Sequence, residues 1–213
     1  MLIDRAGWPF ILVALGLALV LGWWLGRPWA VPFVVLAAFF VFFFRDPDRT
    51  VPTGPGLVVS PADGRVMLPG GPADPGGPEG DWQQITIFLS PVDVHVNRAP
   101  VAGRVTKVEY HPGRFLPAYR RDAGALNERT EIWVDHDGVP IVFRQVVGVL
   151  ARRIVCRLTV GEVIERGQRI GVMKFGSRMD VFLPRTATVH VREGDRVVGG
   201  ETTLAVLAQE GTR

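Results

Sequence analysis

The chain has 213 residues, enough for one domain with an appendage. It carries 24 basic and 21 acidic residues, and a net charge of only +3 without a lysine or arginine cluster argues against nucleic-acid binding. The single cysteine, Cys156, excludes an internal disulfide and a multi-cysteine metal site, and we predict no metal. Because Cys156 lies in an apolar, strand-like run, we predict a buried and inert thiol.

Two uncharged apolar segments open the chain. Residues 8–25 and 29–44 contain no charged side chain and are separated by Gly26-Arg27-Pro28. At 1.5 Å per helical residue, either segment would just span a hydrocarbon core of about 30 Å. We therefore predict that residues 1–50 anchor the chain in a membrane, either as a helical hairpin or as a shallow re-entrant segment.

The charges that flank these segments predict their orientation. Arg5, Arg45 and Arg49 lie outside the two apolar segments, whereas Arg27 alone lies between them. Positive residues favour the cytoplasmic side of a membrane. We expect a cell-membrane protein with its remaining residues on the cytoplasmic face.

Residues 51–213 are predicted to form a β-rich catalytic domain. Glycine and proline recur every few residues, and short β-branched runs lie between them, as is typical of strands joined by turns. The segment "DHDG" at 135–138 predicts a hairpin turn. The Gly- and Pro-rich segment 69–81 predicts a surface loop.

A weak internal repeat indicates how the strands are organised. Two Gly-x-x-Ile/Val-x-x-Gly patterns lie 33 residues apart: Gly161, Ile164 and Gly167 match Gly194, Val197 and Gly200. The pattern resembles half of a biotinyl/lipoyl-type domain, although the carrier lysine of that family is absent. We expect a mainly β fold, a flattened sandwich or barrel with two such halves. An alternative is that glycine-rich turns simply recur, as in any small β barrel.

One Gly-Ser step interrupts the apolar segment "MKFGSRMDVFLP" (173–184). The flanking glycines of a hydrolase nucleophile elbow, Gly-x-Ser-x-Gly, are missing. A serine hydroxyl can instead attack the preceding peptide carbonyl, which requires a small residue on the acyl side, and Gly176 meets that need. Elimination and hydrolysis would then leave a pyruvoyl group where Ser177 had been. A pyruvoyl ketone forms a Schiff base with an amine and acts as an electron sink.

The wider pattern resembles the phosphatidylserine decarboxylase family, in its short membrane-associated form. The similarity covers residues 42–207 and is carried by motifs that occur in this order: "FFFRDPDRTVP", "SPADGRV", "FLSPVDVHVNRAPVAGRV", "NERT", "ARRIVC" and "MKFGSRMDVFLP". It implies decarboxylation of phosphatidylserine to phosphatidylethanolamine and CO2, after self-cleavage between Gly176 and Ser177. The products would be a β chain (1–176) and an α chain (177–213) that stay together as a heterodimer, with a pyruvoyl cofactor derived from Ser177.

The resemblance also implies roles for individual residues. Asp63 matches the aspartate that assists self-cleavage, and Asp93 and His95 match the family's "SPxDxH" stretch. Arg98 stands where the longer bacterial enzymes have a second histidine, so the base for self-cleavage is left open: either His95 activates Ser177, or strain and other donors drive the step.

Alternation along a strand would place Asp93 and His95 on one face. A carboxylate beside the imidazole would raise its pKa and hold its tautomer, which suits a group that protonates the substrate after CO2 is lost.

Substrate contacts are expected from cationic and polar groups. Asn127 and Arg129 match a family stretch and, with Asp93, are the predicted substrate-binding residues. The basic and aromatic segment "GRFLPAYRR" (113–121) is predicted to meet lipid headgroups. The expected partners are phosphatidylserine in the bilayer and the membrane itself, and a higher oligomer is compatible with the sequence.

Three alternatives stay open at this point. One is a pyruvoyl decarboxylase of a soluble amino acid, which would not need the apolar N-terminal segment. A second is a membrane-tethered, biotinyl-like adaptor whose chain stays uncleaved. A third is a relative that has lost self-processing, and Arg98 is the feature that suggests it.

Overall fold

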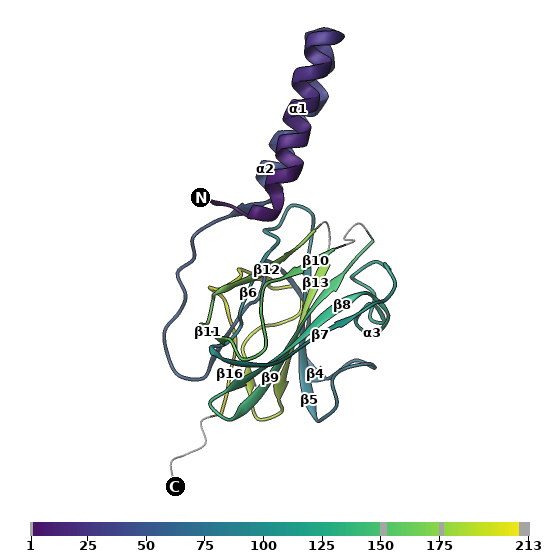
Figure 1. Cartoon of the computed structure of the whole chain (residues 1–213). Coiled ribbons are helices and arrows are strands. Elements are labelled where there is room, and N and C mark those ends of the chain that lie inside the picture. The colour runs from purple at the N-terminus through teal and green to yellow at the C-terminus, as the bar shows by residue number, and fades with distance from the viewer. Residues whose placement is uncertain (1, 150–152, 175–176, 209–213) are drawn as a thin grey trace. The chain divides into compact units, whose positions relative to one another are not determined.

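The computed structural model describes residues 2–149, 153–174 and 177–208. The chain divides into two compact units, Met1–Asp48 and Arg49–Arg213. The first unit is mainly helical, and the second is built of strands joined by loops (Figure 1). The predicted mainly β fold, preceded by apolar helices, is confirmed.

The first unit is a helical hairpin closed by a short pair of strands. Its elements are β1 (Leu2–Ile3), the 3-10 turn η1 (Arg5–Gly7), α1 (Trp8–Trp24), the 3-10 turn η2 (Arg27–Ala30), α2 (Val31–Phe43) and β2 (Arg45–Asp46). The ring of Phe10 on α1 lies 5.4 Å from that of Phe40 on α2. The helical segment Arg5–Trp24 is long and apolar enough to cross a membrane, and Arg27–Phe43 is a shorter apolar segment.

The second unit is built around one curled antiparallel sheet of eight strands (Figure 1). The strand order is β11 (Val163–Ile164), β7 (Gly103–His111), β8 (Arg129–His136), β9 (Val139–Val147), β13 (Ser177–Pro184), β5 (Trp82–Leu89), β4 (Gly64–Pro72) and β15 (Arg196–Val197). Its inner face contributes Ile87, Phe143 and Val181 to the main apolar core.

Two small sheets and one helical turn complete this unit. One sheet has the order β10 (Ile154–Cys156), β12 (Arg169–Met173), β6 (Val96–Arg98), and the other β14 (Thr188–Val189), β16 (Thr203–Val206), β3 (Leu57–Val59). The turn α3 (Ala123–Leu126) lies in the loop that joins β7 to β8. Cys156 on β10 is half-buried, and burial raises the pKa of its thiol, so it is less buried than predicted yet stays in the unreactive form.

The internal repeat occupies equivalent places at the two edges of the curled sheet. The first copy contains β11, which pairs with β7, and the second contains β15, which pairs with β4. In both copies the leading glycine has a positive φ, 91° at Gly161 and 88° at Gly194. Each of these glycines donates its N–H to the neighbouring strand, to Val105 O and to Val66 O respectively. The two copies therefore share the same arrangement of glycine turn and edge strand.

The structure extends this repeat to a second pair of segments. "SPADGRV" (60–66) and "APVAGRV" (99–105) occupy matching positions, because Arg65 donates to the Gly194 carbonyl as Arg104 donates to that of Gly161. A Cβ on Gly64 or Gly103 would lie 2.2 or 2.3 Å from a carbonyl oxygen of the next strand. Glycine is thus required in both halves by the close approach of backbones.

The hairpin predicted at 135–138 joins β8 to β9, with φ of 52° at Asp137 and 86° at Gly138. Two other local predictions were wrong. Strand β4 runs on to Pro72, so the loop predicted at 69–81 begins only after it. Strand β6 begins at Val96, so Asp93 and His95 precede the strand instead of lying on it.

Candidate functional site

Ser177 is the first residue of β13, at the centre of the curled sheet. It pairs with Leu89 of β5 on one side and Val147 of β9 on the other. Its side chain is fully buried, and its Oγ has no hydrogen-bond partner among the described residues. An unpartnered buried hydroxyl costs roughly 1–3 kcal/mol, so this serine does not serve the stability of the fold. Gly176 lies outside the described residues.

Two buried amides lie on the face of the sheet that carries the Ser177 side chain. Gln145 of β9 faces Met179, two residues along β13 from Ser177, and its Nε2 donates to Asn97 Oδ1 at 2.9 Å. Both amides are fully buried, yet Asn97 Nδ2 and Gln145 Oε1 have no partner among the described residues. The sequence analysis missed this pair, although polar residues inside the apolar runs "HVNRA" and "FRQVV" were a signal for it.

His95 is fully buried directly before β6. Its Nδ1 lies 3.0 Å from the backbone oxygen of Asp93. Because a carbonyl can only accept, Nδ1 carries the proton and Nε2 is the basic nitrogen of the neutral ring. The backbone oxygen of His95 accepts from Met173 N, four residues before Ser177, which ties the histidine to the chain that leads into β13.

The carboxylate of Asp93 points away from the imidazole, so the expected pairing of the two side chains was wrong. One oxygen accepts from Ser90 N and Oγ at 2.8 and 2.7 Å, and the other from Arg196 at 3.1 Å. The reason is local: residues 91–93 form a turn, in which strand alternation does not apply. The Asp93 backbone carbonyl holds the histidine tautomer instead.

Asp63 lies in the turn before β4. Its carboxylate accepts from Arg49 Nη2 at 2.8 Å and from Gly199 N at 2.8 Å. Its counterpart in the other half of the unit is Ala102, so the fold does not need a carboxylate at this place. That comparison marks Asp63 as a functional candidate.

Arg98, at the end of β6, donates from its backbone N–H to Pro61 O and from Nη1 to Gly167 O. It is almost fully buried. Arg98 therefore joins the segment that contains Asp63 to the turn at Gly167 in the first copy of the repeat.

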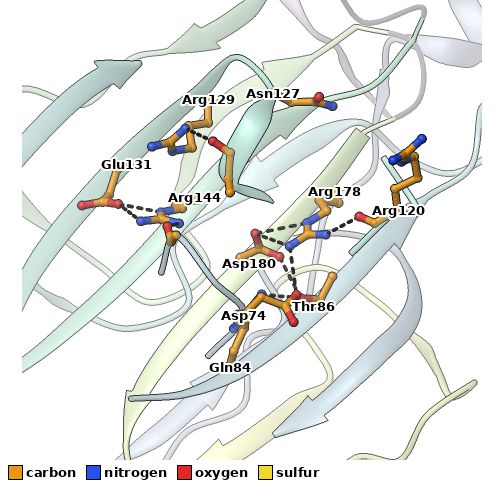
Figure 2. A network of polar contacts seen from close by, with 12 residues as sticks. Asp74, Gln84, Thr86, Arg120, Asn127, Arg129, Glu131, Arg144, Arg178 and Asp180 are labelled. Carbon is orange, nitrogen blue, oxygen red and sulfur yellow. Dashed lines mark hydrogen bonds and ion pairs between the residues drawn. The ribbon is translucent and has the colours of Figure 1, made fainter. Parts of the chain in front are cut away.

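The opposite face of the sheet carries a buried polar network, which Figure 2 shows from close by. Arg178 Nη2 donates to Asp180 at 2.9 Å, and both side chains are almost completely buried. Thr86 donates to the second oxygen of Asp180 at 2.8 Å, and Gln84 donates to Thr86 at 2.9 Å. Gln84 in turn accepts from Asp74 N at 2.8 Å. The network fixes the residue that follows Ser177.

A cavity of about 440 Å³ borders this network. Phe88 and Tyr119 line it with their rings 6.3 Å apart, and Arg65, Arg121 and Arg178 contribute cationic groups. Glu193 contributes a carboxylate as well, but the cationic groups outnumber the acidic ones, so the lining fits a ligand with anionic groups and an apolar part. Asp74 also lines the cavity, and burial raises the pKa of its carboxyl while Arg178 opposes that shift.

The two other predicted substrate contacts lie in the loop before β8 and at its start. Asn127 is fully buried: its Nδ2 donates to Leu116 O and Val147 O, and its Oδ1 accepts from Leu116 N. Both of its donors thus bind backbone, and the amide fastens the loop to the end of β9, beside Ser177. Arg129 donates to Ala125 O, and burial together with Arg144 lowers the pKa of its guanidinium. Their contact with substrate stays a prediction.

One group of side chains has the geometry of a metal site. Ligand atoms of Glu109, His111 and Glu131 lie within 4.8 Å of one another. Each carboxylate already has a cation: Lys107 lies 2.6 Å from Glu109, and Arg144 pairs with Glu131 in a buried contact. No metal was predicted here, and each carboxylate of the group already has a cationic partner.

Comparison with known proteins decides the family. The model of the family described as phosphatidylserine decarboxylase matches residues 36–205. The chain belongs to the phosphatidylserine decarboxylase family. The family predicted from the motifs is therefore confirmed, and with it the assignment of the chain as an enzyme.

Several curated relatives, each named phosphatidylserine decarboxylase proenzyme, match almost from end to end. The protein of Symbiobacterium thermophilum is 49% identical over 212 residues, 98% of this chain and 97% of the relative. That of Paramagnetospirillum magneticum is 46% identical over 220 residues (99% and 90%), and that of Nitrosomonas europaea 42% over 205 residues (96% and 94%). The similarity to this decarboxylase family thus includes both structural units.

Proposed function

We propose that this chain is a proenzyme that cleaves itself between Gly176 and Ser177 and then decarboxylates phosphatidylserine to phosphatidylethanolamine and CO2. The observation that carries the proposal is the buried Oγ of Ser177 at the start of a central strand, which has no partner in the part of the chain that the structure describes. A buried hydroxyl with no hydrogen-bond partner among the described residues is available to attack the carbonyl before it.

The proposed cleavage begins with attack by the Ser177 hydroxyl on the preceding peptide bond. Oγ bonds to the carbonyl carbon of Gly176, the C–N bond to Ser177 breaks, and the hydroxyl proton passes to the released amine through a base. A base then removes the Cα proton of residue 177 while the bond between its Cβ and the ester oxygen breaks, which frees Gly176 as a carboxylate and leaves dehydroalanine. The dehydroalanine tautomerises to an imine, and one water molecule hydrolyses the imine, releasing ammonia and leaving a pyruvoyl group on the nitrogen of Arg178. His95, with Nε2 as its basic nitrogen, is the proposed proton carrier, and Asp63 is the proposed assisting carboxylate.

The pyruvoyl group supplies a ketone that condenses with an amine and accepts the electron pair left by departing CO2. The chain's own residues supply the rest. His95 is proposed to return a proton to the substrate carbon from which CO2 leaves. The cavity beside Arg178 is proposed to receive the anionic headgroup.

The cleaved chains are expected to stay together, because the α chain begins with a central strand. β13 pairs with β5 along its whole length and with β9 over six residues. Two further strands, β15 and β16, pair with β4 and β3 of the β chain. Separation would break all these ladders at once, so the product is a heterodimer.

Membrane attachment follows from the substrate. The acyl chains of phosphatidylserine stay in the bilayer, so the enzyme must work at its surface. The apolar unit Met1–Asp48 is proposed to anchor the chain in the cell membrane and keep the active site near its substrate, with the catalytic unit on the cytoplasmic face.

Intact-mass spectrometry of the purified protein tests the proposal. We expect two fragments, 1–176 and 177–213, the smaller beginning with a pyruvoyl group. Ser177→Ala should abolish both cleavage and decarboxylation. Ser60→Ala is the matched control, because Ser60 is an equally buried serine whose counterpart in the other half is Ala99.

The alternatives give distinct results in the same samples. An intact chain without activity would support the adaptor or a relative that has lost processing. Cleavage with CO2 release from a soluble amino acid, but none from phosphatidylserine vesicles, would support a soluble-substrate enzyme. Activity that persists in Ser177→Ala would refute the mechanism.

A further inference from the structure

Exposed apolar side chains gather at one end of the catalytic unit. Eight large apolar residues are exposed among those described after Arg49: Val92, Tyr110, Phe115, Tyr119, Leu126, Val149, Val160 and Val163. Such side chains normally lie scattered over a soluble surface. All but Val160 and Val163 belong to segments that meet at the Ser177 end of the curled sheet.

Strand register establishes this placement. Ser177 pairs with Leu89 and Val147, so the turn after β5, with Val92, and the residues after β9, with Val149, lie at the end where β13 begins. The β7–β8 loop reaches the same end, because Asn127 binds the Val147 carbonyl. That loop carries Phe115, Tyr119 and Leu126. We call this set of segments the serine end.

The register places the two remaining valines at the opposite end. Val163 of β11 pairs with Arg104 at the start of β7, and Gly161, which follows Val160, donates to Val105. The start of β7 lies beside the end of β8, remote from Arg129, which pairs with Val146 near the serine end. Val160 and Val163 are therefore internal controls of similar size and exposure.

Cationic side chains accompany the apolar ones at the serine end. Arg114, Arg120 and Arg121 are exposed in the β7–β8 loop, and Arg153 is exposed directly before β10, which pairs with the segment leading toward Ser177. Asp122 pairs with Arg120 and offsets part of this charge. Exposed aromatic and aliphatic side chains between arginines fit the boundary of an anionic lipid bilayer.

We propose that the serine end of the catalytic unit docks directly on the surface of an anionic bilayer and inserts Val92, Val149 and the β7–β8 loop among the headgroups. The inference rests on the proposed function, since a lipid substrate makes such docking useful. The cavity lined by Tyr119 and Arg121 belongs to the same end, so docking would bring this cavity close to the lipid surface.

Site-specific fluorescence in the full chain tests the docking. Four single-cysteine variants are made in a Cys156→Ser background: Val92→Cys and Val149→Cys at the serine end, and Val160→Cys and Val163→Cys at the opposite end. The introduced cysteine of each variant is labelled with an environment-sensitive dye. Val92 and Val160 form a matched pair, 61% and 64% exposed. The chains are placed in nanodiscs that contain nitroxide-labelled lipid near the headgroup level, with either phosphatidylglycerol or phosphatidylcholine as the bulk lipid.

In phosphatidylglycerol, dyes at positions 92 and 149 should be quenched at least twofold more than dyes at positions 160 and 163. In phosphatidylcholine, the quenching at positions 92 and 149 should be weaker than in phosphatidylglycerol. Arg114→Glu with Arg121→Glu should reduce that contrast. Equal quenching at both ends, or no quenching at 92 and 149, would overturn the proposal. So would a dye at position 92 that is shielded equally in detergent and in neutral lipid, since a second protein copy would then cover it.

The readout is separate from catalysis. Phosphatidylglycerol is anionic but lacks the amine and carboxylate of the substrate, so quenching does not report occupation of the active site. The Ser177→Ala chain should dock as the unmodified chain does. Failure of self-cleavage with intact docking would contradict only the proposed function, and processed protein without docking would contradict only this inference.

Discussion

The imidazole of His95 is held by the backbone oxygen of Asp93, 3.0 Å from Nδ1, and not by the Asp93 carboxylate. The carboxylate instead caps the turn at Ser90. The two side chains of this motif therefore do not pair, although the Asp93 backbone contacts the imidazole. A backbone acceptor cannot be removed by changing a side chain, which leads to a first prediction.

Asp93→Asn should leave decarboxylation within about tenfold of the unmodified enzyme, because its amide oxygen can still accept from Ser90 and its backbone oxygen still orients His95. His95→Gln should lower the rate by roughly 10²–10⁴-fold, the usual contribution of a general acid or base. CO2 release from phosphatidylserine vesicles measures both. Equal losses in the two variants, at equal thermal stability, would contradict this division of roles.

Variants of Arg49 and Asp63 distinguish the effect of losing their ion pair from the effect of losing the Asp63 carboxylate. Asp63→Ala should slow self-cleavage by on the order of 10²-fold if the carboxylate assists proton transfer. Arg49→Met breaks the same ion pair but keeps the carboxylate, and should slow cleavage less than tenfold. The fraction of cut chain is followed over time after cell-free synthesis. Similar slowing in both variants would mean that the ion pair, and not the carboxylate itself, is what matters.

The Asn97–Gln145 pair should affect cleavage separately from stability. Asn97→Leu leaves Gln145 Nε2 buried without an acceptor, which should cost roughly 1–3 kcal/mol of unfolding free energy. Changing both residues to Leu should restore much of that loss, because no polar atom is left unpaired. Denaturant unfolding of the unmodified chain, Asn97→Leu, Gln145→Leu and the double variant, each in a Ser177→Ala background, completes the cycle.

In chains that retain Ser177, the double variant should still cleave more slowly than the unmodified chain. The reason is that the pair lies on the same inner face as the Ser177 side chain. Unmodified cleavage in a stable double variant would restrict the pair to folding.

Asp74 predicts a pH dependence of stability. Burial raises the pKa of its carboxyl above 3.8, so the unfolded chain loses this proton first as pH increases. Ionisation therefore favours the unfolded state, and the unfavourable contribution is complete only above the folded pKa. The melting temperature of Asp74→Asn minus that of the unmodified chain should therefore increase as pH rises from about 3 to about 7.

Asp81→Asn is the control for that series, because Asp81 lies in the same loop but is 78% exposed. Its difference from the unmodified chain should change less with pH. A difference for Asp74→Asn that stays constant over the whole range would contradict the assigned cause.

Part of the candidate site had a signal in the local sequence pattern. Ser177 stood out because a Gly-Ser step interrupted an apolar segment, and the uncharged segments before Arg45 predicted a helical hairpin. The repeat around Gly161 and Gly194 also had a local signal, since each turn needs a glycine with positive φ. The extension to Gly64 and Gly103 was not visible, because the need for glycine there comes from a neighbouring strand.

The sequence by itself determined the candidate serine, the apolar hairpin and the β-rich character of the second unit, because these depend on residue chemistry and short periodicity. Only the tertiary structure decided that Asn97 meets Gln145, that the Asp93 carboxylate turns away from His95, and that exposed apolar side chains gather at the serine end. Those relationships join segments far apart in the chain. They are set by strand register, which depends on how all the strands pack together and not on any one segment alone.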